Sequence, residues 1–175
     1  MFGGDKIYKK LTWMEFIPST IATILFIVQI IIGIYLLSEI NQNEIIAYIG
    51  VGLYIFSGFI FGMLPTFEFR KEGRVKKGKS YVHTTKLVET GIYSIVRHPQ
   101  YVCFILFAIA GILLFQHWII ICLGLPVIPL IYIDLINADK YGIEKFGEEY
   151  KKYMKKVPRA NFILGFIKTL YKKRN

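Results

Sequence analysis

The chain has 175 residues, of which 54% are hydrophobic, and its mean hydropathy is +0.47. A water-soluble domain of this length does not need so much apolar surface, so the composition excludes an ordinary soluble enzyme. The net charge of +10 can indicate a nucleic-acid-binding protein. Here the basic residues flank long apolar segments, where they face anionic lipid headgroups, and we expect no nucleic-acid partner.

Four apolar segments are predicted to cross a membrane. Backbone polar groups inside lipid must bond to each other, so each segment is predicted to be a helix. The predicted fold class is therefore all-α: a polytopic membrane protein with four transmembrane helices and cytosolic amphipathic helices near the C-terminus. We divide it into an N-terminal transmembrane hairpin, 1–66, and a core, 67–175. The predicted spans, in chain order, are 16–38, 45–66, 101–115 and 118–137.

The distribution of basic residues predicts the orientation. Three Lys precede the first span, eight Lys or Arg lie between the second and third spans, and eleven follow the fourth. The two other connections carry none. By the positive-inside rule, both termini and the middle loop are predicted to be cytoplasmic, and the protein is predicted to be integral to the membrane.

Proline and glycine residues predict the loops and helix breaks of the region 67–175. The stretch 67–86 is basic and Gly-containing, and we predict a cytoplasmic loop. Pro126 and Pro129 are predicted to bend the fourth span. A charged helix should follow, interrupted at Gly142 and Gly147, and the last apolar stretch, 162–175, is predicted to form a short helix on the membrane surface.

The stretch "GIYSIVRHPQYVCF" (91–104) is the main candidate for chemistry. Pro99 suits the first turn of a helix, so the third span is predicted to start there with His98 at its N-cap. Helix N-terminal amides, Arg97 and His98 all favour anions, whereas the faces of Tyr93 and Tyr101 attract cations. The pattern predicts a site for a ligand of mixed charge. The alternative is that these residues anchor the helix among lipid headgroups.

Two motifs resemble a known family. "KLVETGIYSIVRHPQY" is similar to the segment LVxxGxYxxxRHPxY of the isoprenylcysteine carboxyl methyltransferases and their relatives, the membrane phospholipid methyltransferases. "FGEEYKKYMKKVPR" is similar to FGxEYxxYxxxVPR, which follows in the same family after one helical hairpin. The resemblance covers about 87–159.

The resemblance implies an integral membrane enzyme that uses S-adenosyl-L-methionine. Asp139 remains from the acidic pair of the family, whose first place is taken by Ala138, and is implied to meet the cofactor's ammonium. Arg97 and Asp134 are weaker candidates for binding the substrate, because Asp134 stands where the family has a substrate-associated arginine. Asp134 could instead pair with Arg97 or a lysine. The residues implied to bind the cofactor are Leu87, Val88, Tyr93, His98, Pro99, Gln100, Tyr101 and Asp139.

The predicted function is methyl transfer to a lipid-borne acceptor. The first acceptor is the carboxylate of an isoprenylated cysteine, and a phospholipid amine or a thiol is the alternative. Two other classes remain open: a non-catalytic membrane protein that keeps the fold, and an NADPH-dependent relative of the sterol reductases. Asp139 and Glu144 are the candidates for a catalytic base, and neither is assigned that role. Cys103 and Cys122 have no ligand-like spacing, so no metal is expected and both are predicted to be buried.

Overall fold

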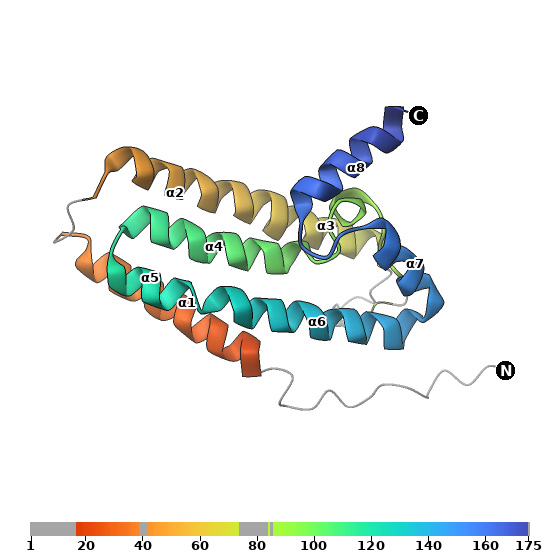
Figure 1. Ribbon diagram of the computed structural model, residues 1–175, viewed down its shortest axis with the longest axis horizontal. Coiled ribbons are helices and arrows are strands. Elements are labelled where there is room, and N and C mark those ends of the chain that lie inside the picture. The colour runs from red at the N-terminus through yellow and green to blue at the C-terminus, as the bar shows by residue number, and fades with distance from the viewer. Residues whose placement is uncertain (1–16, 39–41, 74–83, 85, 175) are drawn as a thin grey trace.

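The computed structural model describes residues 17–38, 42–73, 84 and 86–174 (Figure 1). These residues form helices and contain no strand, which confirms the all-α class. In chain order the elements are α1 (Ile17–Leu36), α2 (Glu44–Ser57), the π-helical η2 (Gly58–Met63), α3 (Leu64–Glu72), the 3₁₀ turn η4 (Gly91–Ser94), α4 (Pro99–Phe115), α5 (Trp118–Gly124), α6 (Val127–Phe146), α7 (Glu148–Lys156) and α8 (Phe162–Arg174).

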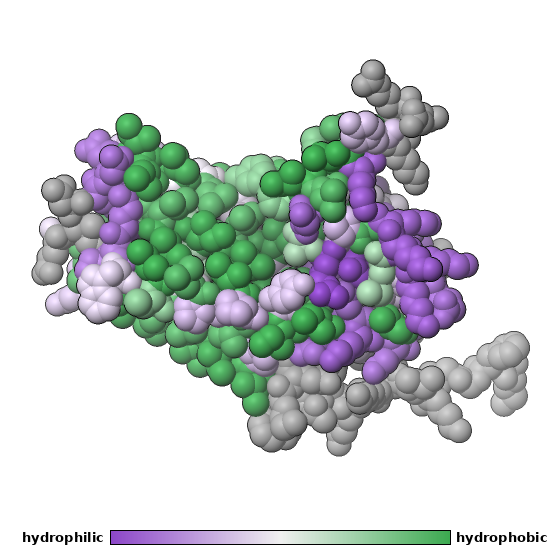
Figure 2. Space-filling model, in the orientation of Figure 1, coloured by the Kyte–Doolittle hydropathy of each residue, from purple (hydrophilic) through white to green (hydrophobic). Residues whose placement is uncertain are grey.

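Three helical segments are long and apolar enough to cross a membrane: 17–36, 44–72 and 118–146. The remaining predicted span corresponds to α4, which is apolar but has 17 residues. Figure 2 shows an apolar band between two polar ends of the molecule. Large hydrophobic side chains on α1 and α2 are exposed in this band, as expected for surfaces that face lipid.

The second predicted span extends further than expected. The segments α2, η2 and α3 form one continuous helical stretch that ends at Glu72, so the prediction of a loop from residue 67 is wrong for 67–72. Residues "FEFRKE" contain no helix breaker, and Arg70 and Lys71 lie in the last turn, where cations favour the helix dipole. The helix ends where Gly73 follows.

The fourth predicted span is broken and longer than expected. It breaks between α5 and α6 around Pro126, close to the predicted bend, and α6 then continues beyond residue 137 to Phe146. Gly142 does not interrupt α6, whereas Gly147 does, with φ 57°. A Cβ atom on Gly142 would collide with the ring of Tyr150, so this glycine serves close packing of α7 against α6.

Close helix packing places α4 in the middle of the bundle, against α2 and beside α6 (Figure 1). A Cβ atom on Gly50 would come within 2.7 Å of the backbone nitrogen of Leu114, so α2 and α4 touch nearly backbone to backbone. Gly58 and Gly62 also face α4, which shows that their GxxxG spacing serves packing within the chain.

A buried glutamine ties three helices together inside the apolar band. The side-chain amide of Gln29 is fully buried and donates to the carbonyl oxygens of Ala108 at 3.2 Å and Ile120 at 3.3 Å. Such hydrogen bonds join α1 to α4 and α5 where no water is available. The cysteines differ: Cys103 is buried as predicted, whereas Cys122 is exposed on the apolar surface of α5, so that prediction is wrong.

The two motif segments meet at one end of the bundle. The backbone amide of Arg97 donates to the carbonyl of Pro158 at 3.1 Å, and that of His98 donates to Arg159 at 3.3 Å. These bonds fasten the turn before α4 to the segment after α7. Figure 1 shows α7 and α8 at this same end, next to α3.

Candidate active site

A buried carboxylate, Asp139, is the centre of the polar end of the bundle. Its Oδ1 atom accepts hydrogen bonds from Arg97 Nη1 at 2.8 Å and from the Tyr150 hydroxyl at 2.9 Å. His98 Nε2 lies 2.8 Å from the same oxygen and donates to it, because a carboxylate can only accept. His98 is the N-cap of α4, as predicted.

The second oxygen of Asp139 is also occupied. Oδ2 accepts from Arg159 Nε at 2.6 Å, and the guanidinium of Arg159 lies over the ring of Tyr132, 5.7 Å from its centroid. Asp139 is 3% exposed and Arg97 is 8% exposed. Charges buried so deeply persist in proteins only when they are paired and hydrogen-bonded, and both oxygens here meet that condition.

Two tyrosines on α7 complete the cluster. Burial and the adjacent carboxylate of Asp139 raise the pKa of Tyr150, so its hydroxyl stays protonated and donates. Burial likewise raises the pKa of Tyr153, whose hydroxyl donates to the backbone carbonyl of Tyr93 at 2.6 Å. These bonds hold α7 against both α6 and the turn η4.

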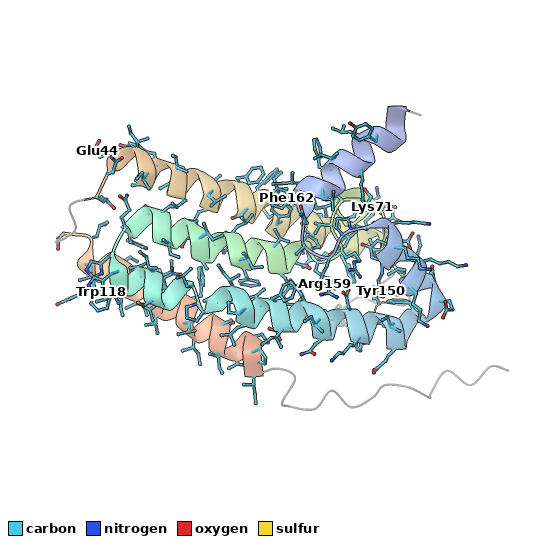
Figure 3. All side chains as sticks on the ribbon, in the orientation of Figure 1. Glu44, Lys71, Trp118, Tyr150, Arg159 and Phe162 are labelled. Atoms are coloured by element: carbon cyan, nitrogen blue, oxygen red, sulfur yellow. The ribbon has the colours of Figure 1, made fainter. Side chains whose placement is uncertain are left out.

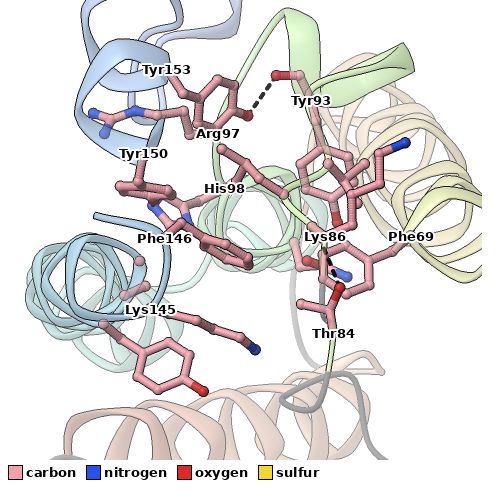
Figure 4. A pocket seen from close by; sticks show the side chains of 16 residues that line it. Phe69, Thr84, Lys86, Tyr93, Arg97, His98, Lys145, Phe146, Tyr150 and Tyr153 are labelled. Atoms are coloured by element: carbon pink, nitrogen blue, oxygen red, sulfur yellow. Dashed lines mark hydrogen bonds between the residues drawn. The ribbon is translucent and has the colours of Figure 1, made fainter. Parts of the chain in front are cut away.

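A cavity of about 200 Å³ opens beside this cluster (Figure 4). Its walls come from α3, the segment before α4, α6 and α7, so both motif segments contribute to it. The described residues that line it are Phe69, Thr84, Lys86, Leu87, Val88, Tyr93, Arg97, His98, Gln100, Ala138, Tyr141, Gly142, Lys145, Phe146, Tyr150 and Tyr153.

The lining of this cavity is cationic and aromatic. Among the described lining residues there are basic side chains, Lys86 and Lys145 included, but neither Asp nor Glu. The Lys145 ammonium lies 5.5 Å from the ring centroid of Tyr141 and 5.4 Å from that of Phe146. Cationic groups suit a ligand's carboxylate, and aromatic faces suit a flat base or a sulfonium.

The structure separates the predicted cofactor residues into four places. Five of them line the cavity: Leu87, Val88, Tyr93, His98 and Gln100. Pro99 is buried in the first turn of α4. Tyr101 lies in a second, smaller cavity. Asp139 lies behind the described wall, with both oxygens already hydrogen-bonded, so an additional ligand ammonium would have to compete with those donors.

The two substrate candidates do not form a pair. Arg97 binds Asp139, and Asp134 hydrogen-bonds to Ser19 on α1 instead. Asp134 is 4% exposed, and its Oδ2 atom has no hydrogen-bond partner in the described part of the chain. The alternative pairing of Asp134 with Arg97 is therefore wrong. In the sequence, Glu148 and Glu149 precede Lys151 to Lys156, which predicts ion pairs on the helix surface. One such pair is present, because Lys151 Nζ lies 2.6 Å from Glu148 Oε1. His83, in the basic loop sequence, is predicted to be solvated rather than a ligand, and it lies outside the described residues.

Several cavity residues were missed by sequence reasoning. Phe146 at the end of α6 and Tyr150 and Tyr153 on α7 all belong to the second motif. The spacing of the two tyrosines along α7 was a usable signal, but the sequence predicted only a charged helix there. Arg159, the last residue of that motif, was not singled out either. Phe69 and Lys145 carried no local signal, since only the packing of α3 and α6 brings them to the cavity.

Fold and site together define a helical membrane protein in which two separated motifs meet around a cavity at one polar end. Residues 74–155 match the model of the isoprenylcysteine carboxyl methyltransferase (ICMT) family. This match confirms the resemblance to that family which the two motifs predict.

Two curated relatives agree with the family match, and both are named protein-S-isoprenylcysteine O-methyltransferase. The one from Schizosaccharomyces pombe is 26% identical over 165 residues, which cover 89% of this chain and 58% of the relative. The one from Saccharomyces cerevisiae is 36% identical over 89 residues, which cover 46% of this chain and 37% of the relative. The matched regions thus span about half the length of these relatives. No solved structure matches the chain.

Proposed function

We propose that this protein is an integral membrane methyltransferase that uses S-adenosyl-L-methionine to methylate a membrane-borne acceptor. The observation that carries the proposal is that the two motif segments, distant in sequence, close around one cavity with cationic donors and aromatic faces. The family match and the names of both relatives support the reaction class.

The cavity lining fits the parts of S-adenosyl-L-methionine. When bound, this cofactor supplies a methyl group on a positively charged sulfur. Lys86 and Lys145 provide cations for its carboxylate, and Tyr93 and Phe146 provide aromatic faces for its adenine or sulfonium. Bound cofactor and the aromatic side chains of the lining together displace water, which would compete with the acceptor.

Asp139 orients His98 within this site. Because Nε2 of His98 donates to Asp139, the neutral ring carries its proton there and leaves Nδ1 as an acceptor. His98, which was predicted to favour an anion, is then suited to a hydroxyl or ammonium group of the ligand, and Lys86 and Lys145 bind the carboxylate. Asp139 acts in this proposal as a positioning residue.

Two acceptor classes are considered. The printed names of the relatives favour the carboxylate of an isoprenylated cysteine, which is already anionic and needs no base, and this is the first acceptor to assay. An amine on an apolar chain is the second. It is favoured by one observation, the buried carboxyl group of Asp134 with its unpartnered oxygen.

The proposal includes four membrane spans and cytoplasmic termini. Helix α4 lies between α2 and α6 in the apolar band, which supports a fourth crossing despite its 17 residues. The basic residues gather on the motif end, which supports a cytoplasmic position for that end. Helix α8 exposes Ile163, Phe166, Ile167 and Leu170, which supports a place on the membrane surface.

Calorimetric titration of S-adenosylhomocysteine into detergent-solubilised protein tests the cofactor site. We expect micromolar binding, weakened about tenfold or more by His98→Ala. The matched control is His117→Ala, which should leave the affinity unchanged. His117 precedes Trp118 at the start of α5, and Trp118 lies at the opposite end of the bundle from Tyr150 and Arg159 (Figure 3). Absence of binding to the unmodified protein even at millimolar ligand would contradict the proposed function.

A transfer assay then tests the acceptor. The protein is incubated with S-adenosyl-L-methionine carrying a labelled methyl group and with either a farnesylated cysteine or a membrane lipid extract. Label that enters the organic phase in a base-labile form indicates a methyl ester, whereas base-stable label indicates methylation on nitrogen or sulfur. No label in either case, despite cofactor binding, would indicate a non-catalytic protein.

A further inference from the structure

A second cavity lies between α1, α4 and α6, on the lipid-facing side of the bundle. It has a volume of about 50 Å³ and is lined mainly by apolar side chains, with Ser19, Thr23 and Tyr101 as polar members. Phe104 on its wall is 44% exposed, so the cavity borders the surface that faces lipid. None of the residues that line this cavity also lines the proposed cofactor cavity.

Asp134 lies on α6 between residues that line the two cavities. Ser19, which lines the second cavity, hydrogen-bonds to the carboxyl group of Asp134. On α6, Asp134 lies three residues after Ile131, which lines the second cavity, and four before Ala138, which lines the first. Residues at these spacings share one face of a helix, so Asp134 stands on the stretch of α6 between the two cavities.

Tyr101 provides an independent link between the two cavities. Its ring lies 5.9 Å from the ring of His98, which lines the first cavity, and Tyr101 itself lines the second. A group held beside Asp134 and Tyr101 would therefore lie close to the wall that carries His98. This is the place where an acceptor entering from lipid would approach the cofactor site.

The oxygen Oδ2 of Asp134 is buried and has no hydrogen-bond partner in the described part of the chain. A buried carboxyl oxygen without a partner is costly, and an ionisable group within a membrane-spanning helix is rarely kept without a use. When the carboxyl group is ionised, this oxygen needs a hydrogen-bond donor, and a cation satisfies it best. A second carboxylate in the same place would be repelled.

We propose that Asp134 and the cavity beside Ser19 and Tyr101 form a binding site for a primary amine carried on an apolar chain. This inference rests on the proposed methyl transfer for its role, and it selects the amine over the carboxylate as acceptor. Asp134 pairs with the ammonium, the first carbons of the chain enter the apolar cavity, and the rest of the chain lies along the lipid-facing surface beside Phe104. When the proton moves to Oδ2, an N–H bond breaks, an O–H bond forms, and the electron pair stays on the nitrogen, which becomes nucleophilic.

Three ligands with one tail and different head groups test the site. They are farnesyl thioethers of 2-aminoethanethiol, 2-mercaptoethanol and 3-mercaptopropionic acid, which present an amine, an alcohol and a carboxylate. Saturable binding is measured by calorimetry on the full chain in phosphatidylcholine nanodiscs, without cofactor. We expect the amine to bind at least tenfold more tightly than the alcohol, and the carboxylate to bind least tightly.

Asp134→Asn is the test variant, because asparagine keeps the size of the side chain and removes its charge. It should abolish the tenfold preference and leave the affinity for the alcohol unchanged. Glu144→Gln, an exposed change on the same helix, is the matched control and should keep the preference. Equal binding of amine and alcohol to the unmodified protein, tightest binding of the carboxylate, or an unaltered preference in Asp134→Asn would overturn the inference.

The separate titration with S-adenosylhomocysteine distinguishes the two proposals. Cofactor binding without an amine preference contradicts only the assignment of Asp134. An amine preference without cofactor binding contradicts the methyltransferase function and leaves the amine site in place.

Discussion

Two carboxyl groups five residues apart on α6 have opposite surroundings. Asp139 accepts hydrogen bonds from four side chains on the segment before α4, on α7 and on the segment after α7. Asp134 hydrogen-bonds to Ser19, and its other oxygen has no partner in the described part of the chain. Both are almost fully buried. Burial alone therefore does not distinguish a structural carboxylate from one that binds a ligand. The distinguishing property is whether both carboxyl oxygens have hydrogen-bond partners within the protein.

The same comparison assigns different roles to the two regions. Around Asp139 the donors come from both family motifs, so this region holds the motif segments together and shapes the cavity. Around Asp134 the neighbours come from α1, α4 and α6, and they leave one oxygen for a ligand. We therefore propose a structural role for Asp139 and an acceptor-binding role for Asp134.

The largest expected effect comes from removing the charge of Asp139, with removal of the charge of Asp134 as the comparison. Asp139→Asn leaves Arg97 buried beside a neutral group, and breaking a buried pair in this way costs about 3–5 kcal/mol. Asp134→Asn removes an incompletely satisfied buried acid and should be neutral or stabilising. Thermal unfolding in detergent measures both variants, and we expect a loss on the order of 10 °C for Asp139→Asn alone.

Equal losses of unfolding temperature in the two variants would contradict this comparison. In that case Asp134 would be as important to the folded structure as Asp139. The argument that its second oxygen serves a ligand would then fail.

A smaller loss of stability is expected from Gly142→Ala, which affects Asp139 by displacing the ring of Tyr150. In Gly142→Ala the new methyl group would lie 2.6 and 2.7 Å from the Cε atoms of Tyr150, and the ring would have to move away from Asp139. Overpacking of this kind costs about 1–3 kcal/mol, more than the helix propensity that alanine gains. The unfolding temperature and the affinity for S-adenosylhomocysteine should both fall.

Gly52→Ala is the control for this change, because nothing lies within 4 Å of the added methyl group. Alanine there should be neutral or stabilise α2 by up to about 1 kcal/mol. If Gly142→Ala were as stable as Gly52→Ala, the close packing of Tyr150 on α6 would not be needed for the cluster.

Much of this arrangement was predictable from sequence. Pro99 and His98 identify the start of α4, and the order of the two motifs indicates that their segments meet. Those predictions rest on local rules for helix starts and on matching motifs. The continuation of α6 to Phe146 was not predicted, because the packing role of Gly142 depends on Tyr150, which lies on another helix.

Long-range contacts also explain what was missed at the site. Nothing near Asp139 in the sequence shows that Arg97 and Arg159 occupy its oxygens, since these residues are 42 and 20 positions away. The sequence likewise marks Asp134 as an unusual acid in an apolar segment. Only the structure shows that Ser19, on α1, hydrogen-bonds to the carboxyl group of Asp134.

Removal of a single donor from Asp139 should have a modest effect. Tyr150→Phe deletes one hydrogen bond at 2.9 Å and leaves Arg97, His98 and Arg159 in place. The expected cost is about 0.5–1.5 kcal/mol in thermal unfolding. Tyr171→Phe, on the exposed surface of α8, is the control and should be neutral. A cost as large as that of Asp139→Asn would mean that Asp139 depends on Tyr150 rather than on several donors together.

The smallest expected effect is the pH dependence of that hydrogen bond. Burial and Asp139 raise the pKa of Tyr150 above its ordinary value of 10.0, so the folded protein keeps this proton at a pH where the unfolded chain loses it. The unfolded state then binds fewer protons, and the stabilisation that Tyr150 provides decreases as pH rises above about 10. Below that pH the difference in unfolding temperature between the unmodified protein and Tyr150→Phe should be constant, and above it the difference should shrink. A difference that grew with pH would show that the hydroxyl ionises readily in the folded state, and hence that Asp139 is less enclosed than its four donors indicate.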